Sequence, residues 1–181
     1  MAKVYKRKKK NTVPVKDVEA KQNYTIRKLS NTVEIAPKIF IKFKNNSFSD
    51  LRKRLLKDIS KEQFAVLLGK YETAGDIKII NVIDVKFAAV SDYHDQRHAF
   101  LKMKKEFIYD ILAEIKKRYD ADTIIDVHTH PFSKEFTSFS GVDDSDERSF
   151  CRFINDKFDD IHYASIVLSQ KQYSARLWEI K

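Results

Sequence analysis

The stretch IIDVHTHPFSKEFTSFSGVDDSD, residues 124–146, holds two histidines one residue apart and a run of acidic residues at its end. Residues 123–127, at its start, are mostly apolar and β-branched, and they predict a strand. Side chains alternate along a strand, so His128 and His130 project from the same face at its end. Pro131 cannot donate a backbone hydrogen bond to a neighbouring strand, and it helps to end this one.

The histidine pair and a later aspartate form a candidate metal site. Two imidazoles side by side on a rigid strand suit a metal ion, and Asp143 can return from the following loop as a third ligand. Two nitrogens, one carboxylate and a fourth position open to water are typical of catalytic zinc sites. The alternative is structural, because a lone H-x-H is common by chance and its histidines are usually half-buried strand residues. The aspartate downstream and a glutamate upstream favour the metal.

That glutamate, Glu62, stands just before residues 64–68, an apolar run that predicts a short buried strand. Hydrolysis at zinc needs a group that takes a proton from water and passes it to the leaving amine, and a carboxylate does this well. Ser140 can donate a hydrogen bond to the oxyanion that develops on an attacked carbonyl. The structural alternatives are an exposed carboxylate at the strand entry for Glu62 and a helix cap for Ser140.

These residues, as a set, resemble the motif of the JAB/MPN (JAMM) metalloproteases, which are zinc-dependent isopeptidases acting on ubiquitin-like conjugates. The matching residues form the patterns E-x6-G, H-x-H-P and S-x-x-D: Glu62, Gly69, His128, His130, Pro131, Ser140 and Asp143. The resemblance covers residues 62–181 and implies one α/β (α+β mixed) domain with a central mixed sheet flanked by helices, similar to cytidine deaminases.

The resemblance also implies a role for each site residue. Glu62 would be the general acid and base, and Ser140 would support the tetrahedral intermediate. One Zn²⁺ with a bound water would be held by His128, His130 and Asp143. The implied activity is removal of a ubiquitin-like protein from its conjugates, or processing of its C-terminus.

The loop before the aspartate departs from the family pattern. The family commonly has ten residues between the second histidine and the aspartate, whereas residues 131–142 number twelve here. Gly141 occupies the usual position, so we expect Asp143 rather than Asp144 or Asp146 as the ligand. The FSGVDD wording is similar to bacterial members found beside E1-like and E2-like proteins in ubiquitin-like conjugation operons, some of them antiviral. The resemblance therefore implies those proteins as partners.

Two other functional classes were weighed against the protease. Amidohydrolase TIM barrels also carry H-x-H on their first strand, but 51 residues after His130 are too few for a barrel of about 200 residues or more. The remaining alternative is a catalytically silent MPN scaffold or binding module. In that case a basic tail would contact nucleic acid or an acidic partner.

Charge and composition bound the rest of the chain. Residues 1–22 contain eight basic and two acidic residues and carry most of the net charge of +9, which predicts a disordered tail before a domain at 23–181. No nucleic-acid-binding motif accompanies the tail, so we do not expect a nucleic-acid partner. Without an 18-residue apolar run or a secretory signal, we expect a cytoplasmic protein with no membrane partner. Cys151, the single cysteine, excludes a disulfide framework and is expected in the core.

Apolar spacing and turn residues predict the remaining elements. We expect a helix capped by Ser49 and running to Ile59, and a hairpin turning at Gly75-Asp76. Residues 90–97 are expected to form a polar loop, and residues 98–119 a long helix. A further helix is expected to begin near Asp143, with Asp144 and Asp146 in its first turn. The predicted strands are 24–27, 38–44, 64–68, 77–88, 123–127, 163–168 and 173–179.

Overall fold

The computed structural model describes residues 25–26, 32–36, 38–118, 120–135, 137–158 and 160–178. The expected basic tail, 1–22, lies outside these residues. The strands are β1 (Thr25–Ile26), β2 (Thr32–Ala36), β3 (Ile39–Lys42), β4 (Phe64–Ala74), β5 (Ile77–Phe87), β6 (Tyr93–Arg97), β7 (Phe100–Met103), β8 (Thr123–Thr129), β9 (His162–Leu168) and β10 (Tyr173–Trp178). The helices are α1 (Ser47–Leu55), the short 3₁₀ helix η1 (Val90–Asp92), α2 (Lys105–Lys117) and α3 (Gly141–Lys157).

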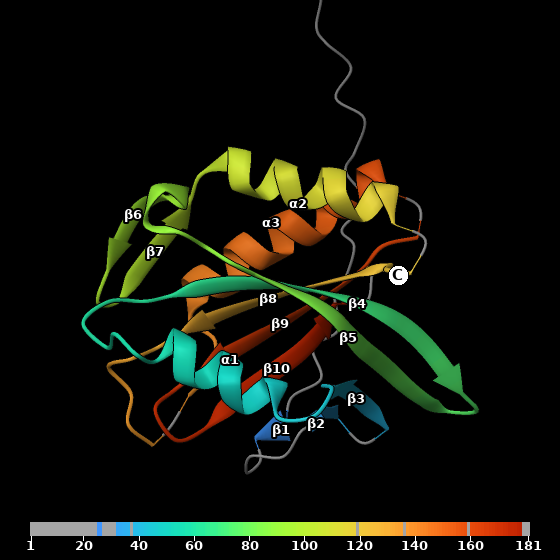
Figure 1. Cartoon of the computed structure of the whole chain (residues 1–181), viewed down its shortest axis with the longest axis horizontal. Helices are drawn as coiled ribbons and strands as arrows, with labels where there is room; N and C mark the ends of the chain where they lie inside the picture. Colours follow the sequence, from blue (N-terminus) through green and yellow to red (C-terminus); the bar gives the residue numbers. More distant parts are fainter. Residues whose placement is uncertain are drawn as a thin grey trace, which may run out of the picture.

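Eight of the described strands form one mixed sheet in the order β1-β10-β9-β8-β4-β5-β3-β2, and β6 and β7 form a separate hairpin. Helix α1 lies against one face of the sheet, and α2 and α3 lie against the other (Figure 1). The predicted mixed α/β class is therefore confirmed. No helix among the described residues is long and apolar enough to cross a membrane.

Strand β8 lies in the middle of the sheet and is buried along its whole length. It pairs antiparallel with β4, where His128 lies opposite Phe64, and parallel with β9, where His128 lies opposite Val167. Its backbone is thus hydrogen-bonded on both edges. Such a strand is a rigid base for side chains that must hold a fixed geometry.

The alternation along β8 decides which face carries the site. Ile125 and Val127 join the apolar core under α1, whereas Ile124 joins the core under α2 and α3. The period of two then places Asp126 and His128 on the α2–α3 face, in line with Ile124. His130 continues this row just beyond the strand.

The predicted long helix at 98–119 is wrong in its first third. Residues 100–103 form β7, which pairs with β6, and the helix α2 begins only at Lys105. The expected polar loop at 90–97 is accordingly η1 followed by β6. Leu101 and Met103, two residues apart, are the half-buried side chains of β7. The apolar residues of this segment are also spaced as in a helix, but the segment pairs with β6 and forms a strand.

The first helix also differs from its prediction. Helix α1 begins at Ser47, where the Ser47 hydroxyl donates to the Lys44 carbonyl at 2.6 Å, so Ser49 lies inside the helix instead of capping it. The helix ends at Leu55, and Ile59 is 49% exposed. Strand β2 was not predicted. The hairpin of β4 and β5 is confirmed, with Gly75 at φ 63° in its turn.

The C-terminal elements agree with the sequence-based expectations. Strands β8, β9 and β10 lie at the three expected positions, and the helix expected near Asp143 is α3. Its first turn carries Asp143 and Asp144, whereas Asp146 lies beyond that turn. Because α3 starts directly after the loop from β8, it returns the chain to the end of the histidine strand.

Candidate metal centre

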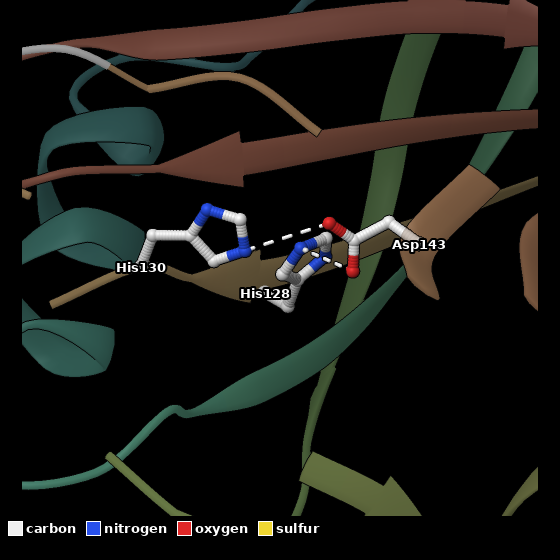
Figure 2. A group of neighbouring side chains, drawn as sticks. All are labelled: His128, His130 and Asp143. Atoms are coloured by element: carbon white, nitrogen blue, oxygen red, sulfur yellow. Dashed lines mark ion pairs between the residues drawn. The ribbon is translucent and has the colours of Figure 1, made fainter. Parts of the chain in front are cut away.

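Three side chains that can bind a metal converge at the end of β8 (Figure 2). His128 and His130 come from the strand and the residue after it, and Asp143 comes from the first turn of α3. His128 Nε2 lies 3.4 Å from Asp143 Oδ1, and His130 Nε2 lies 3.5 Å from Asp143 Oδ2. The two histidines are buried, and Asp143 is half-buried. Both predicted histidines and the predicted aspartate thus lie together.

The spacing of these atoms fits a zinc ion. A tetrahedral Zn²⁺ with bonds of about 2.0–2.2 Å holds neighbouring ligand atoms about 3.4 Å apart. The two measured nitrogen–oxygen distances are 3.4 and 3.5 Å. In addition, His128 Nε2 is a buried nitrogen without a hydrogen-bond partner. The three residues could therefore hold a metal ion, and their spacing is compatible with zinc.

Ser140 fixes the position of Asp143 by capping α3. The Ser140 backbone N–H donates to Asp143 Oδ2 at 2.5 Å, and the Asp143 backbone N–H donates to Ser140 Oγ at 3.2 Å. This is a capping box, which satisfies two backbone donors at the helix start. Ser140 Oγ acts as an acceptor in it, so its hydroxyl proton is not used by this bond. The cap expected as the structural alternative is present, and it orients the candidate ligand.

Glu62 is buried rather than exposed at the strand entry, so that alternative is wrong. The hairpin of β6 and β7 holds its backbone, since Glu62 N–H donates to the Arg97 carbonyl at 2.8 Å and Gln96 Nε2 donates to the Glu62 carbonyl at 2.7 Å. Its carboxylate Oε1 lies 4.0 Å from His130 Nε2. The β6–β7 hairpin, which was not predicted, therefore positions the predicted proton carrier.

Burial also tunes the acidity of Glu62. Desolvation raises the pKa of its carboxyl group, the positive charge of His128 lowers it, and the negative charge of Asp143 raises it, to about 7 overall. A carboxyl group with this pKa can both accept and release a proton near neutral pH. This property suits a residue that moves one proton twice in a reaction.

His128 and Asp143 change each other's pKa values. Burial lowers the pKa of His128, but the nearby carboxylates, that of Asp143 foremost, raise it more, to about 9. Burial raises the pKa of Asp143, and the two histidines hold it well below its usual range. A metal ion takes the place of a proton between such groups, because ligating imidazoles must be neutral.

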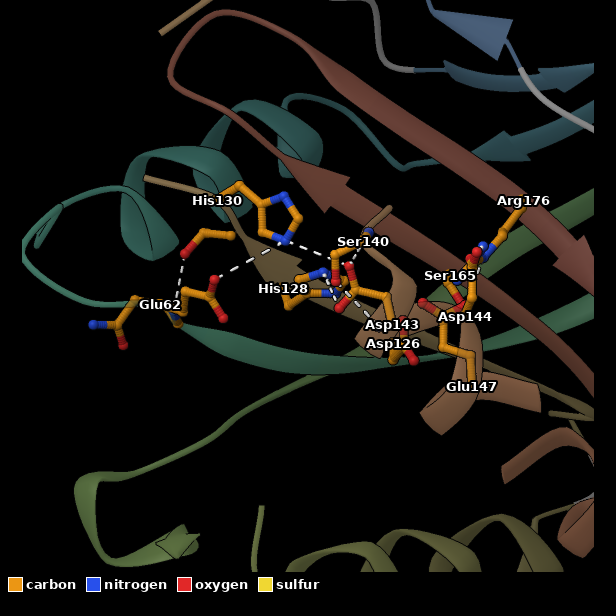
Figure 3. Close-up of polar contacts among 12 residues, drawn as sticks. Glu62, Asp126, His128, His130, Ser140, Asp143, Asp144, Glu147, Ser165 and Arg176 are labelled. Atoms are coloured by element: carbon orange, nitrogen blue, oxygen red, sulfur yellow. Dashed lines mark hydrogen bonds and ion pairs between the residues drawn. The ribbon is translucent and has the colours of Figure 1, made fainter. Parts of the chain in front are cut away.

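A second group of acidic side chains lies deeper along the same face (Figure 3). Asp126 and Glu147 lie close enough to His128 for one ligand atom of each to fall within 4.8 Å of the others. Glu147 Oε2 accepts from Arg176 Nε at 2.7 Å and Trp178 Nε1 at 2.9 Å, and also from the Ser165 hydroxyl. The Tyr163 hydroxyl donates to Asp126 Oδ2.

Sequence reasoning missed this group, although two spacings pointed to it. Asp126 stands two residues before His128 on the strand, so the two side chains share a face. Glu147 stands four residues after Asp143, so these two share a face of α3. Asp144, weighed as an alternative ligand, bonds to Arg176 instead, and Asp146 is exposed.

A cavity of about 440 Å³ opens beside the metal cluster. Its lining includes Glu62, His128, His130 and Asp143, together with Asp126 and Glu147. Most of its remaining wall is apolar and comes from β4, β7, β8, α2 and α3, with Phe64, Leu101, Ile111, Ile124 and Phe150 among its residues. A ligand group can therefore lie directly beside the cluster.

Two other histidines and the cysteine lie outside this arrangement. The His162 ring stacks on Tyr71 at 4.0 Å, and the His98 ring lies 5.8 Å from Phe132. Cys151 is buried, as predicted, and burial together with the nearby charge of Glu147 raises the pKa of its thiol to about 11. A thiol that stays protonated is a poor nucleophile.

A comparison with models of known protein families finds no match for this chain, and a comparison with curated proteins finds none either.

Proposed function

We propose that this chain is a zinc-dependent peptidase that cleaves a ubiquitin-like protein from its conjugates or trims its C-terminus. The observation that carries this proposal is the carboxylate of Glu62, whose pKa is about 7, lying 4.0 Å from a nitrogen of the three-residue metal cluster. The ubiquitin-like substrate, and E1-like or E2-like partners, rest on the sequence resemblance to JAB/MPN proteases.

The proposed chemistry assigns one task to each residue. His128, His130 and Asp143 would hold Zn²⁺, which when bound polarises a carbonyl and makes water acidic enough to ionise near neutral pH. Glu62 takes a proton from the attacking water and then gives it to the leaving amine. Its burial next to the cluster keeps this proton away from solvent.

Ser140 and the loop before α3 complete the site. The Ser140 hydroxyl proton, which the capping box does not use, is available for an oxyanion that forms near Asp143. The capping box meanwhile keeps Asp143 facing the histidines. One serine would then serve both the helix and the reaction, which accounts for the S-x-x-D spacing.

The test measures metal content and cleavage on the same preparations. We expect about one zinc per chain in the wild type, and cleavage of the C-terminal amide of at least one member of a panel of ubiquitin-like proteins. Asp143→Asn should lose the zinc. Glu62→Gln should keep the zinc and lose cleavage by about 10²-fold or more, because only the proton carrier is removed.

The matched control is Asp156→Asn, which removes an exposed carboxylate from the far end of α3. It should leave both zinc and cleavage unchanged. Full cleavage by Glu62→Gln would remove Glu62 from the mechanism. A wild type that binds no zinc, even when zinc is added back, would point instead to a catalytically silent scaffold.

A further inference from the structure

The cavity beside the metal cluster combines apolar walls with an acidic floor. Its walls include Val66 of β4, Ile111 of α2 and Phe150 of α3. Its floor carries two carboxylates, Asp126 of β8 and Glu147 of α3, which are only 8% and 5% exposed. Charged groups are rarely buried at such a depth unless a partner compensates them.

Each of these carboxylates keeps one oxygen without a partner. Asp126 Oδ2 accepts from the Tyr163 hydroxyl, but Asp126 Oδ1 has no hydrogen-bond partner. Glu147 Oε2 accepts three hydrogen bonds, but Glu147 Oε1 has none. Leaving a buried acceptor unpaired is costly, so an added donor would be favourable at both oxygens. Both oxygens have almost no accessible surface, so the two carboxylates must turn toward the cavity to meet a ligand there.

The positive charge beside the floor is too small to neutralise it. Arg176 is completely buried and is shared between Glu147 and Asp144. Asp126 accepts a hydrogen bond from the Tyr163 hydroxyl, which carries no charge. His128 lies nearby, but its imidazole must be neutral when it binds a metal. Three carboxylates thus face one buried guanidinium group, and the lysine that also lines the cavity, Lys102 of β7, is an exposed side chain. A cation is the ligand that this balance favours.

We propose that this cavity is a specificity pocket for a lysine or arginine side chain of the substrate, close to the scissile bond. The proposal rests on the proposed function and deepens it. A basic side chain has an apolar stem, which fits the walls, and a charged head with several donors, which fits Asp126 Oδ1 and Glu147 Oε1.

The position of the floor along β8 agrees with this occupant. Asp126 stands two residues before His128, which separates their backbones by about 7 Å along the strand. The side chains lie nearer to the cluster than the backbones do, because one ligand atom each of Asp126, Glu147 and His128 falls within 4.8 Å of the others. The floor is therefore within reach of a basic side chain that stands next to a bond held at the cluster.

A second metal ion is the competing occupant, because Asp126, Glu147 and His128 come within ligand distance of one another. It is less well supported by the surroundings. His128 Nε2 already faces Asp143, and the apolar side chains of the walls provide no ligand atoms for a metal. The experiment below separates the two cations.

Trp178 provides a direct reporter for this pocket. It is the single tryptophan of the chain, and its Nε1 donates to the same carboxylate, Glu147. Its fluorescence in the full chain can be followed while N-acetyl-lysine methylamide is added, with the norleucine derivative as the uncharged match. We expect a saturable change with the lysine probe and none with norleucine. Equal responses to both probes would overturn the proposal.

Two variants localise the binding. Asp126→Asn and Glu147→Gln each remove the charge of one floor carboxylate, and each should weaken lysine binding by at least about tenfold. Asp110→Asn, an exposed aspartate of α2, is the matched control and should bind like the wild type. Unchanged binding by a correctly folded floor variant would overturn the proposal. So would a second equivalent of zinc that Asp126→Asn abolishes while the lysine probe has no effect.

A cleavage experiment separates this inference from the proposed function. The zinc-loaded wild type is incubated with a mixed peptide library, and the cleaved bonds are identified by mass spectrometry. We expect lysine or arginine enriched beside the cleaved bond, and loss of that preference in Asp126→Asn. Cleavage without basic preference removes the pocket and keeps the peptidase. Lysine binding in a chain that neither binds zinc nor cleaves removes the peptidase and keeps the pocket.

Discussion

Glu62 makes the metal-free protein less stable at neutral pH than in mild acid. Its pKa rises from the ordinary 4.5 to about 7 on folding, so the folded state keeps a proton that the unfolded state has already lost. The contribution of Glu62 to the free energy of unfolding therefore falls as pH rises from 4.5 to about 7, and it stays reduced above that. This is the cost of burying the Glu62 carboxyl group.

Glu62→Gln should remove this pH dependence. In chelator-treated protein we expect the variant to be about 1–3 kcal/mol more stable than the wild type at pH 8, with the difference shrinking towards zero near pH 4.5. Urea unfolding at both pH values measures it. A stability difference that does not change with pH would show that the carboxyl group titrates normally.

Arg176 is the residue on which the buried acidic group depends. Its guanidinium group bonds to Glu147 and Asp144 and lies 3.7 Å from the centre of the Phe139 ring. Arg176→Met leaves two carboxylates without their cation, and we expect it to lower the free energy of unfolding by about 3–5 kcal/mol. Urea unfolding tests this, with Arg152→Met on the exposed side of α3 as the control. Equal stability of the two variants would contradict the assignment.

At this scale the sequence predicts some residues of the site and not others. His128 and His130 follow from the alternation of a strand, which is a local rule. Asp143 was expected from the S-x-x-D pattern of the family resemblance, although its loop is two residues longer than is common in that family. The partnership of Glu147 with Arg176 depends on β10 lying beside β9, and no local pattern contains that information.

Among the elements, the β4–β5 hairpin contains a close approach that only glycine permits. A β-carbon on Gly69 would lie 2.8 Å from Ile80 Cγ2 and 3.2 Å from the Asn81 carbonyl oxygen, at an irregularity in the strand pairing. The glycine of the E-x6-G pattern thus has a packing reason. It lets β5 lie close against the strand that follows Glu62.

Gly69→Ala should therefore destabilise the protein by about 1–3 kcal/mol, because backbone and a buried side chain must move. Gly141→Ala is the matched change, since a β-carbon there meets nothing within 4 Å and alanine favours a helix. Thermal unfolding of both variants gives the comparison. A Gly69→Ala protein as stable as Gly141→Ala would mean that the sheet adjusts without strain.

The elements also show where sequence patterns are ambiguous. Residues 100–103 carry apolar side chains that fit a helix extended from α2, yet they pair with β6 in a hairpin. The local pattern was compatible with both, and pairing decided between them. The consequence for the site is large, because this hairpin holds the backbone of Glu62.

For the whole molecule, metal binding should be coupled to folding. The three candidate ligands come from β8, the residue after it and α3, and they meet only in the folded chain. Zinc at about a thousandfold excess over its dissociation constant should add about 4 kcal/mol to the free energy of unfolding. Thermal unfolding with zinc and with a chelator measures the shift.

Asp143→Asn provides the contrast for that measurement, because it should melt at the same temperature with and without zinc. A wild type whose melting temperature does not change with zinc would contradict the metal site.

At this scale the sequence predicted a mixed sheet with helices, but not the strand order. That order depends on contacts between segments far apart in the chain.

The pairing of β8 on both edges has a consequence for hydrogen exchange. Amides in a central strand exchange only when the whole domain opens, whereas the first turn of a helix with exposed residues opens far more often. His128 would then stay in place during most fluctuations, and Asp143 would leave and return with the start of α3. A bound metal would tie the mobile ligand to the fixed one. Metal binding would slow amide hydrogen exchange at the start of α3 and leave the exchange of β8 amides unchanged.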